Sequence, residues 1–184
     1  MVYIGLTGLN AAGKGTVSDY FVNKGFIYYS LSDIVREKAT ALGLDHSRTS
    51  LIHCGNLLRH ELGSAALAKV ITERISQDPD KDYIIDSIRN LSEIEELRTL
   101  KNFHLIGVDA PVKLRFARSK TRGRASFENT LEDFISVELK ENSSDPKKQQ
   151  LLECMKAADI TIHNDKGIKE LNFALGSLMS TLKK

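Results

Sequence analysis

The chain has 184 residues, of which 41% are hydrophobic and 27% charged, which fits one globular domain and excludes an intrinsically disordered chain. Its 26 basic and 24 acidic residues leave a formal charge of +2, so a general nucleic-acid binder or a membrane-surface protein is not expected.

Two kinds of segment alternate along the chain. Short apolar runs rich in Ile, Val and Tyr are typical of buried strands, and they predict strands at residues 2–7, 26–30, 83–86, 103–109 and 160–163. Apolar residues three and four positions apart predict helices over residues 14–24, 33–42, 91–100, 112–121 and 168–182. Ser92 and Glu95 have the spacing of a capping box for the third of these helices. This alternation predicts an α/β fold in which a five-stranded parallel sheet has helices on both sides.

Two longer stretches interrupt the alternation. Residues 40–77 and 122–158 predict mostly helical insertions after the second and the fourth strand. Within the second insertion, the polar run at residues 141–148 predicts an exposed turn. Because no linker rich in Pro or Gly divides the chain, we expect a single domain over residues 1–184.

The two cysteines, Cys54 and Cys154, are far apart and lack the spacing of metal ligands. They predict free thiols in a reducing compartment, with no structural disulfide and no zinc site. The sequence contains no apolar run long enough for a membrane span and starts with a predicted strand where a signal peptide would lie. We therefore expect a cytoplasmic protein with no membrane partner.

Residues 8–16, with the sequence G-L-N-A-A-G-K-G-T, follow the first predicted strand and lead into a helix. A glycine-rich loop in this position lets backbone N–H groups converge on phosphate oxygens, and the helix N-terminus adds positive potential. Lys14 then reaches the β- and γ-phosphates of ATP and neutralises charge during transfer. The loop predicts a P-loop NTPase fold and an ATP site built from Gly8, Asn10, Ala11, Ala12, Gly13, Lys14, Gly15 and Thr16.

Gly15 stands where the strict motif has Ser or Thr, and the resulting run G-K-G-T resembles that of adenylate kinases. The resemblance implies a three-layer nucleoside monophosphate kinase that uses ATP and Mg²⁺. It also implies that Thr16 contacts phosphate and that Mg²⁺ is held through water and the nucleotide, without direct protein ligands. Adenylate kinases usually carry Pro and Gly where this chain has Asn10 and Ala11, so the methyl group of Ala11 is expected to crowd the approach of phosphate.

The segment at residues 30–36 resembles the acceptor-binding S-T-G-D-x-x-R of adenylate kinases, with Ser32 in place of glycine. By this likeness Ser32, Asp33 and Arg36 belong to the acceptor site. An arginine suits that role because its planar guanidinium binds phosphate through two parallel hydrogen bonds.

The run Y-I-I-D-S-I-R resembles the D-G-x-P-R motif of the same kinases. Asp86 ends the third predicted strand, at the edge where open α/β sheets bind ligands, and it is a candidate to organise Mg²⁺ through water or to orient the acceptor. Arg89 is the expected second arginine on the acceptor phosphate. Residues 55–63 match the region that closes over the acceptor base, which implies that Arg59 touches phosphate and that Asn56 reads a base edge.

Residues 110–122 resemble the adenylate-kinase segment that leads into the lid. The likeness implies that Arg118 stacks on adenine and that Arg122 stabilises charge on the transferring phosphoryl group. A helix presents both side chains on one face, because the two arginines are four positions apart. Arg124 is an expected helper, whereas Arg115 is expected on a solvated basic face.

Two features separate this chain from adenylate kinases. Residues 125–158 contain no arginine, although the family's lid normally supplies two more. The tail A-D-I-T-I-H-N-D-K-G resembles a stretch of dephospho-CoA kinases, which implies that Asn164 lies near adenine, but the acidic D-x-D element of those enzymes is missing. Over nearly its whole length the chain is similar to archaeal adenylate-kinase-like proteins and to P-loop segments of some deoxycytidylate deaminases.

Together these patterns predict phosphoryl transfer from ATP to a small phosphorylated acceptor, a nucleoside or deoxynucleoside monophosphate. The predicted catalytic residues are Lys14, Asp86, Arg118 and Arg122. Two alternatives stay open: a dephospho-CoA kinase-like enzyme, and a slow ATPase that binds a macromolecule as an assembly or regulatory factor. The identity of the acceptor and the oligomeric state are not predicted.

Overall fold

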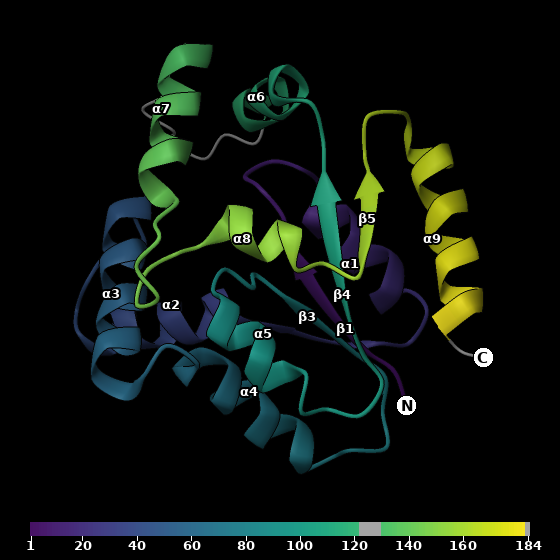
Figure 1. The fold of residues 1–184 in the computed structure, drawn as a ribbon, viewed down its shortest axis with the longest axis horizontal. Helices are drawn as coiled ribbons and strands as arrows, with labels where there is room; N and C mark the ends of the chain where they lie inside the picture. The colour runs from purple at the N-terminus through teal and green to yellow at the C-terminus, as the bar shows by residue number, and fades with distance from the viewer. Residues whose placement is uncertain (122–129, 183–184) are drawn as a thin grey trace.

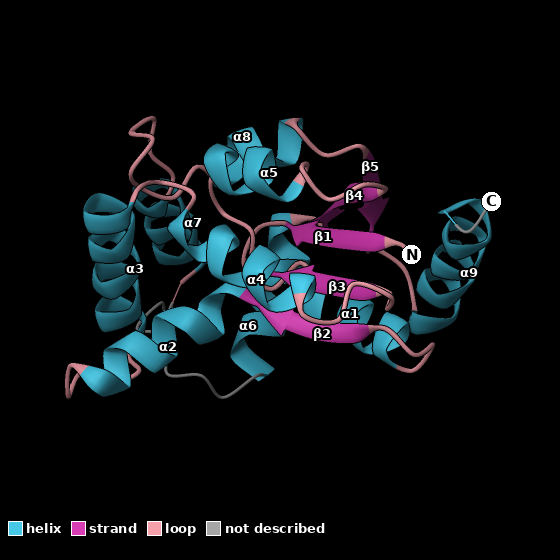
Figure 2. Cartoon of the chain, turned by 90° about the horizontal axis from the view of Figure 1, so that it is seen from below, coloured by secondary structure: helices cyan, strands magenta, loops and turns pink. Residues whose placement is uncertain are grey.

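The computed structural model describes residues 1–121 and 130–182. Its strands form one parallel sheet in the order β2-β3-β1-β4-β5 (Figures 1 and 2). The strands are β1 (Tyr3–Thr7), β2 (Ile27–Ser30), β3 (Tyr83–Asp86), β4 (Phe103–Asp109) and β5 (Ile160–His163). Because all strands run in one direction, their carboxyl ends share one edge of the sheet. The predicted five-stranded parallel sheet is confirmed.

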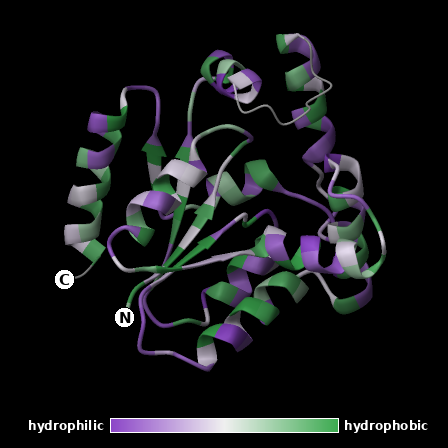
Figure 3. Cartoon of the chain, turned by 180° about the vertical axis from the view of Figure 1, so that it is seen from behind, coloured by the Kyte–Doolittle hydropathy of each residue, from purple (hydrophilic) through white to green (hydrophobic). Residues whose placement is uncertain are grey.

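Helices cover both faces of this sheet and make three layers. One face packs on α1 (Lys14–Val22) and α9 (Ile168–Leu182). The other face packs on α2 (Leu31–Ala41), α4 (Ala66–Ser76), α5 (Leu91–Leu97) and α8 (Leu151–Lys156). Figure 3 shows the strands largely hydrophobic between helices that carry hydrophilic positions.

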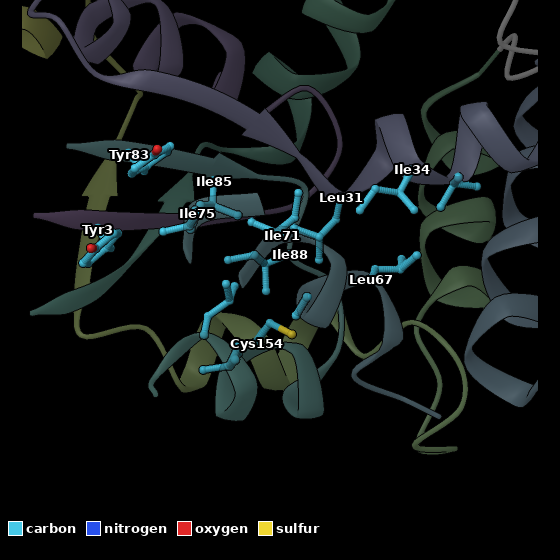
Figure 4. Packing of buried hydrophobic residues seen from close by; sticks show 14 of the residues in the cluster. Tyr3, Leu31, Ile34, Leu67, Ile71, Ile75, Tyr83, Ile85, Ile88 and Cys154 are labelled. Carbon is cyan, nitrogen blue, oxygen red and sulfur yellow. The ribbon is translucent and has the colours of Figure 1, made fainter. Parts of the chain in front are cut away.

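The side chains of the strands fill the space between the layers. On the α4 side, the rings of Tyr3 and Tyr83 stack with centroids 6.0 Å apart, beside Ile85 and the helix residues Ile71 and Ile75 (Figure 4). β1 and β3 are therefore buried on both sides, as their continuous apolar sequences predict.

The remaining helices lie toward the carboxyl-terminal edge of the sheet. α3 (Arg48–Leu62) packs beside α2, while α6 (Val112–Thr121) follows β4 and α7 (Leu131–Glu141) stands above α3 (Figures 1 and 2). Arg48 of α3 holds Glu141 of α7 through two hydrogen bonds, of 2.5 Å from Nε and 2.8 Å from Nη2. Of these helices, α3 belongs to the first predicted insertion and α7 to the second, whereas α6 precedes the second insertion.

Helix starts differ from two sequence predictions. The capping box of α5 is formed by Asn90 and Glu93, so its assignment to Ser92 and Glu95 is wrong by two residues. Asn90 accepts a hydrogen bond from the N–H of Ser92, and the Glu93 carboxylate accepts the N–H of Asn90. α2 begins at Leu31, two residues before the predicted start at residue 33.

Both cysteines are buried and free, as predicted. Burial raises the pKa of the Cys154 thiol to about 12, and burial also raises the pKa of Cys54. In the described part of the chain, no helix is both long enough and apolar enough to cross a membrane.

The burial of the thiols predicts slow thiol–disulfide exchange with a reagent while the protein is folded. Since the thiolate is the reactive form, a raised pKa and steric protection act in the same direction. We expect both thiols to react with a chromogenic disulfide reagent at neutral pH at least ~100-fold more slowly in buffer than in denaturant. Fast reaction of Cys154 in buffer would contradict this packing.

Candidate active site

The loop between β1 and α1 bends through residues with positive φ. Gly8 has φ 150°, Ala11 has φ 58° and Gly13 has φ 107°. A Cβ at Gly8 would lie 2.4 Å from the carbonyl oxygen of Val108, and one at Gly13 would lie 2.1 Å from Nδ2 of Asn164. Both glycines are therefore required sterically. Alternation of left-handed and right-handed residues turns successive N–H groups toward one side, which makes a concave anion site.

Ala11 takes a backbone conformation that favours glycine. Ala11 is only 4% exposed, so its methyl group packs against the protein. The expected crowding of phosphate by this methyl group stays a prediction. The substitution also introduces backbone strain at the centre of the loop.

Lys14, the first residue of α1, folds back over the loop. Its Nζ donates to the carbonyl oxygens of Gly8 at 2.7 Å and Leu9 at 3.2 Å. Gly15 is exposed, and a Cβ added there would meet nothing within 4 Å. Thr16 is half-buried in the first turn of the helix. An ammonium group thus lies beside backbone amides at a helix N-terminus, the combination that binds phosphate.

The structure brings Arg118 and Asn164 together at this loop. Asn164 donates from Nδ2 to the carbonyl oxygen of Ala12 at 2.9 Å, and Arg118 reaches the same oxygen at 3.4 Å. Nη2 of Arg118 is also 3.4 Å from Oδ1 of Asn164. Two residues assigned to adenine from separate family resemblances are therefore neighbours. Arg122 and Arg124 lie outside the described residues.

Asp86 lies at the end of β3, next to β1 in the sheet and so close to the loop. Its carboxylate accepts hydrogen bonds from the N–H of Ser87 at 2.6 Å and from the hydroxyl of Tyr28 at 3.4 Å. Burial and the neighbouring Asp86 raise the pKa of Tyr28 to about 12, so this phenol stays a hydrogen-bond donor at neutral pH. No group of three or more His, Cys, Asp or Glu side chains that would hold a metal occurs among the described residues.

The predicted acceptor residues of α2 contact one another. Nη1 of Arg36 donates to Oγ of Ser32 at 2.9 Å and to Oδ1 of Asp33 at 2.6 Å. Ser32 also lies 3.4 Å from Oγ of Ser87, the residue after Asp86. Asp33 thus balances the charge of Arg36, and Arg36 remains half-exposed and close to β3.

Arg89 lies in the turn that follows β3. Its Nη1 donates to Oε1 of Gln149 at 3.2 Å, and its N–H donates to Oε2 of Glu93 at 2.8 Å. Burial lowers the pKa of the guanidinium, while Glu141 and Asp86 oppose this shift. A charged group held in a low-dielectric site interacts strongly with an anionic ligand.

Arg59 is buried in an ion pair with Glu93, which corrects its assignment as a phosphate contact. Arg59 is 2% exposed and Glu93 is fully buried. Nε and Nη2 of Arg59 donate to one carboxylate oxygen of Glu93, at 3.0 and 2.7 Å. Because the other oxygen of Glu93 holds the N–H groups of Arg89 and Asn90, Arg59 supports the turn that carries Arg89.

A pocket of about 270 Å³ opens between α3 and α7. Its polar lining includes Arg48, Asn56, Lys140, Lys148 and Gln149, the residue that contacts Arg89. The amide oxygen of Asn56 is buried, and among the described residues it accepts no hydrogen bond. Buried acceptors are usually paired, so this unpaired oxygen in a residue that lines the pocket makes Asn56 a candidate contact for a ligand.

Sequence reasoning missed Arg115, which it assigned to a solvated face. Arg115 is 4% exposed and donates to the backbone of the phosphate loop and to Glu138 of α7. No local signal marks it, because its acidic partner is 23 residues away.

Comparison with known proteins finds relatives among archaea. A UPF0200 protein of Thermococcus gammatolerans is 33% identical over 141 residues, which is 74% of each chain. A UPF0200 protein of Pyrobaculum aerophilum is 30% identical over 182 residues, or 98% of each chain. No protein-family model matches the chain.

Solved structures share the fold at low sequence identity. TT1252 from Thermus thermophilus has a TM-score of 0.66 at 19% identity, covering 98% of this chain and 97% of that one. A shikimate kinase from Acinetobacter baumannii, solved with shikimate, has a TM-score of 0.57 at 17% identity, covering 98% and 94%. The chain therefore has the fold of P-loop kinases.

The pairing of Arg59 with Glu93 predicts a large stability effect. Arg59→Ala leaves a buried carboxylate without its partner and should lower the free energy of unfolding by ~3–5 kcal/mol in denaturant titration. The matched control is Arg74→Ala, which breaks the exposed 3.0 Å pair with Glu37 and should cost less than ~1 kcal/mol. Equal effects of the two variants would contradict the burial of Arg59.

Proposed function

The chain belongs to the UPF0200 protein family. We propose that it transfers the γ-phosphoryl group of ATP to a small phosphorylated acceptor. The observation that carries the proposal is a phosphate loop closed by Lys14 after β1, with Asp86 at the end of the neighbouring strand β3 and Arg89 fixed in the turn that follows β3. A nucleoside or deoxynucleoside monophosphate is the acceptor that this arrangement favours.

The donor end is the loop of residues 8–16. The N–H groups of the loop and the Nζ of Lys14 bind the β- and γ-phosphates. When ATP binds, the Nζ of Lys14 leaves the carbonyl oxygens of Gly8 and Leu9 and donates to the phosphates instead. Arg118 and Asn164 flank the same loop and serve the adenosine part of ATP.

The acceptor end is formed by Arg36 and Arg89. Arg89 is fixed through its backbone by Glu93, and Arg36 is oriented by Ser32 and Asp33. Two guanidinium groups that converge on one phosphate orient its oxygen toward the donor. In this proposal α3 of the first insertion acts as the acceptor-binding part and α7 of the second acts as the lid of a single domain, while α4 and α8 pack on the sheet.

The proposed step is a direct displacement at phosphorus. An anionic oxygen of the acceptor phosphate forms a bond to the γ-phosphorus, and the bond from that phosphorus to the bridging oxygen breaks, which releases ADP. The acceptor oxygen already lacks a proton, so the step needs no general base. Lys14 neutralises charge on the moving group.

Asp86 and Thr16 are the residues that fit a hydrated magnesium ion. Asp86 is a carboxylate at the sheet edge beside the loop, and Thr16 offers a half-buried hydroxyl in the first turn of α1. When bound with ATP, Mg²⁺ supplies charge neutralisation for the phosphates. Tyr28, which stays a neutral donor, fixes the orientation of the Asp86 carboxylate.

The composition of the lid supports a second candidate function, a slow ATPase that works as an assembly or regulatory factor. Residues 125–158 contain lysines and no arginine, and lysine orients phosphate less strictly than arginine. Such a factor would hydrolyse ATP without responding to a small acceptor.

A coupled ADP-release assay separates these candidates. The acceptor panel comprises ribonucleoside and deoxyribonucleoside monophosphates, dephospho-CoA, and shikimate as an acceptor without phosphate. We expect stimulation by a monophosphate, loss of that stimulation in Arg89→Ala, and at least a ~100-fold lower turnover in Lys14→Ala. Lys69→Ala, an exposed lysine of α4, is the control and should keep full turnover. ATP hydrolysis that no acceptor of the panel stimulates would favour the assembly or regulatory factor. Near-normal turnover of Lys14→Ala would refute the role of Lys14.

The pocket beside Arg89 predicts where the acceptor is discriminated. In Asn56→Ala, the acceptor loses a hydrogen-bond partner for its base, so the KM for the best monophosphate should rise by ~10-fold while kcat changes less than ~3-fold. The KM for ATP should stay the same, because Asn56 belongs to α3 and is not one of the donors that hold the loop at residues 8–16. An unchanged acceptor KM would remove Asn56 from the site.

A further inference from the structure

The buried guanidinium of Arg115 joins three parts of the molecule. Nε donates to the carbonyl oxygen of Ala110 at 3.0 Å, at the end of β4. Nη1 donates to the carbonyl oxygen of Asn10 in the phosphate loop at 3.2 Å. The same group pairs with both carboxylate oxygens of Glu138 in α7, with Nη2 2.9 Å from Oε2, and lies 5.6 Å from the centre of the Phe134 ring.

The bond to Asn10 acts on the neighbouring amide. The carbonyl group of Asn10 and the N–H of Ala11 belong to one planar peptide unit and point in opposite directions. A donor that holds the carbonyl outward therefore fixes the N–H of Ala11 on the other side of the loop. Arg115 thus controls the direction of one of the amides that face phosphate.

Ala11 needs such control more than a glycine would. Its φ of 58° lies in the left-handed region, which is unfavourable for alanine. Without an external restraint, rotation of this residue toward the right-handed region would turn its peptide group out of the loop. The hydrogen bond from Arg115 opposes that rotation.

We propose that Arg115 is a positioning residue that holds the phosphate loop in its binding conformation, and that α7 supports it through Glu138. The inference rests on the proposed function in one respect, that the loop binds the phosphates of ATP. Glu138 aligns the guanidinium of Arg115 through two hydrogen bonds. A displacement of α7 would therefore move this guanidinium and change the conformation of the loop at Asn10. The lid helix and the nucleotide site are therefore coupled.

Binding measurements on the full chain test this coupling. The readout is the dissociation constant of a non-hydrolysable ATP analogue by calorimetry, which does not require turnover. Arg115→Met should weaken binding by at least ~10-fold, and Glu138→Gln should weaken it by ~3-fold or more. Arg115→Lys keeps the charge but lacks the planar fork, so it should not restore full affinity. Lys113→Met, an exposed lysine of the same helix, should bind as the unmodified chain does.

The decisive variant combines Arg115→Met with Ala11→Gly. Glycine adopts the left-handed conformation at no steric cost, so it should recover the affinity to within ~3-fold of Ala11→Gly alone. An equal loss in the alanine and glycine backgrounds would overturn the inference, because Arg115 would then act through some other route. Circular dichroism melting of each variant separates a loss of affinity in the folded protein from a loss caused by unfolding. Glu138→Gln provides the milder test if Arg115→Met does not fold.

Failure of the two proposals gives different results. If the unmodified chain does not bind the analogue, the proposed function falls. If the unmodified chain binds it and Arg115→Met binds equally well, only the role of Arg115 falls.

Discussion

The conformation of the phosphate loop depends on donors from elsewhere in the chain that hold two of its carbonyl groups, because each peptide unit then directs its N–H to the opposite side. Here the carbonyl oxygen of Asn10 is held by Arg115, and that of Ala12 is held by Asn164 and Arg118. These donors come from α6 and from the turn after β5, both at the carboxyl edge of the sheet. The order of the strands thus matters chemically, because it brings β4 and β5 beside the loop after β1.

The proposed acceptor end is also held by a side chain from within the protein, here a buried carboxylate. Glu93 is fully buried, and it binds Arg59 with one oxygen and the backbone of Arg89 and Asn90 with the other. The turn after β3 is therefore fixed before any ligand arrives. α7 connects the two ends, since it pairs with α3 through Arg48 and with α6 through Glu138.

The sequence was sufficient for the sheet and the phosphate loop, because both depend on local patterns. The strands over residues 83–86, 103–109 and 160–163 and the helices over 112–121 and 168–182 were predicted with their observed ends. Arg59 and Arg115 could not be assigned in this way. Their partners, Glu93 and Glu138, are 34 and 23 residues away, and helical spacing alone does not tell a solvated arginine from one buried by tertiary contacts.

The hydrogen bond between Asn164 and Ala12 spans 152 residues. During translation, β1 and the glycine-rich turn leave the ribosome long before the residue that braces them. The turn therefore gains its final shape only after β5 has joined the sheet. In the proposed function, the turn therefore reaches its nucleotide-binding conformation only in a chain that already contains β5 and Asn164.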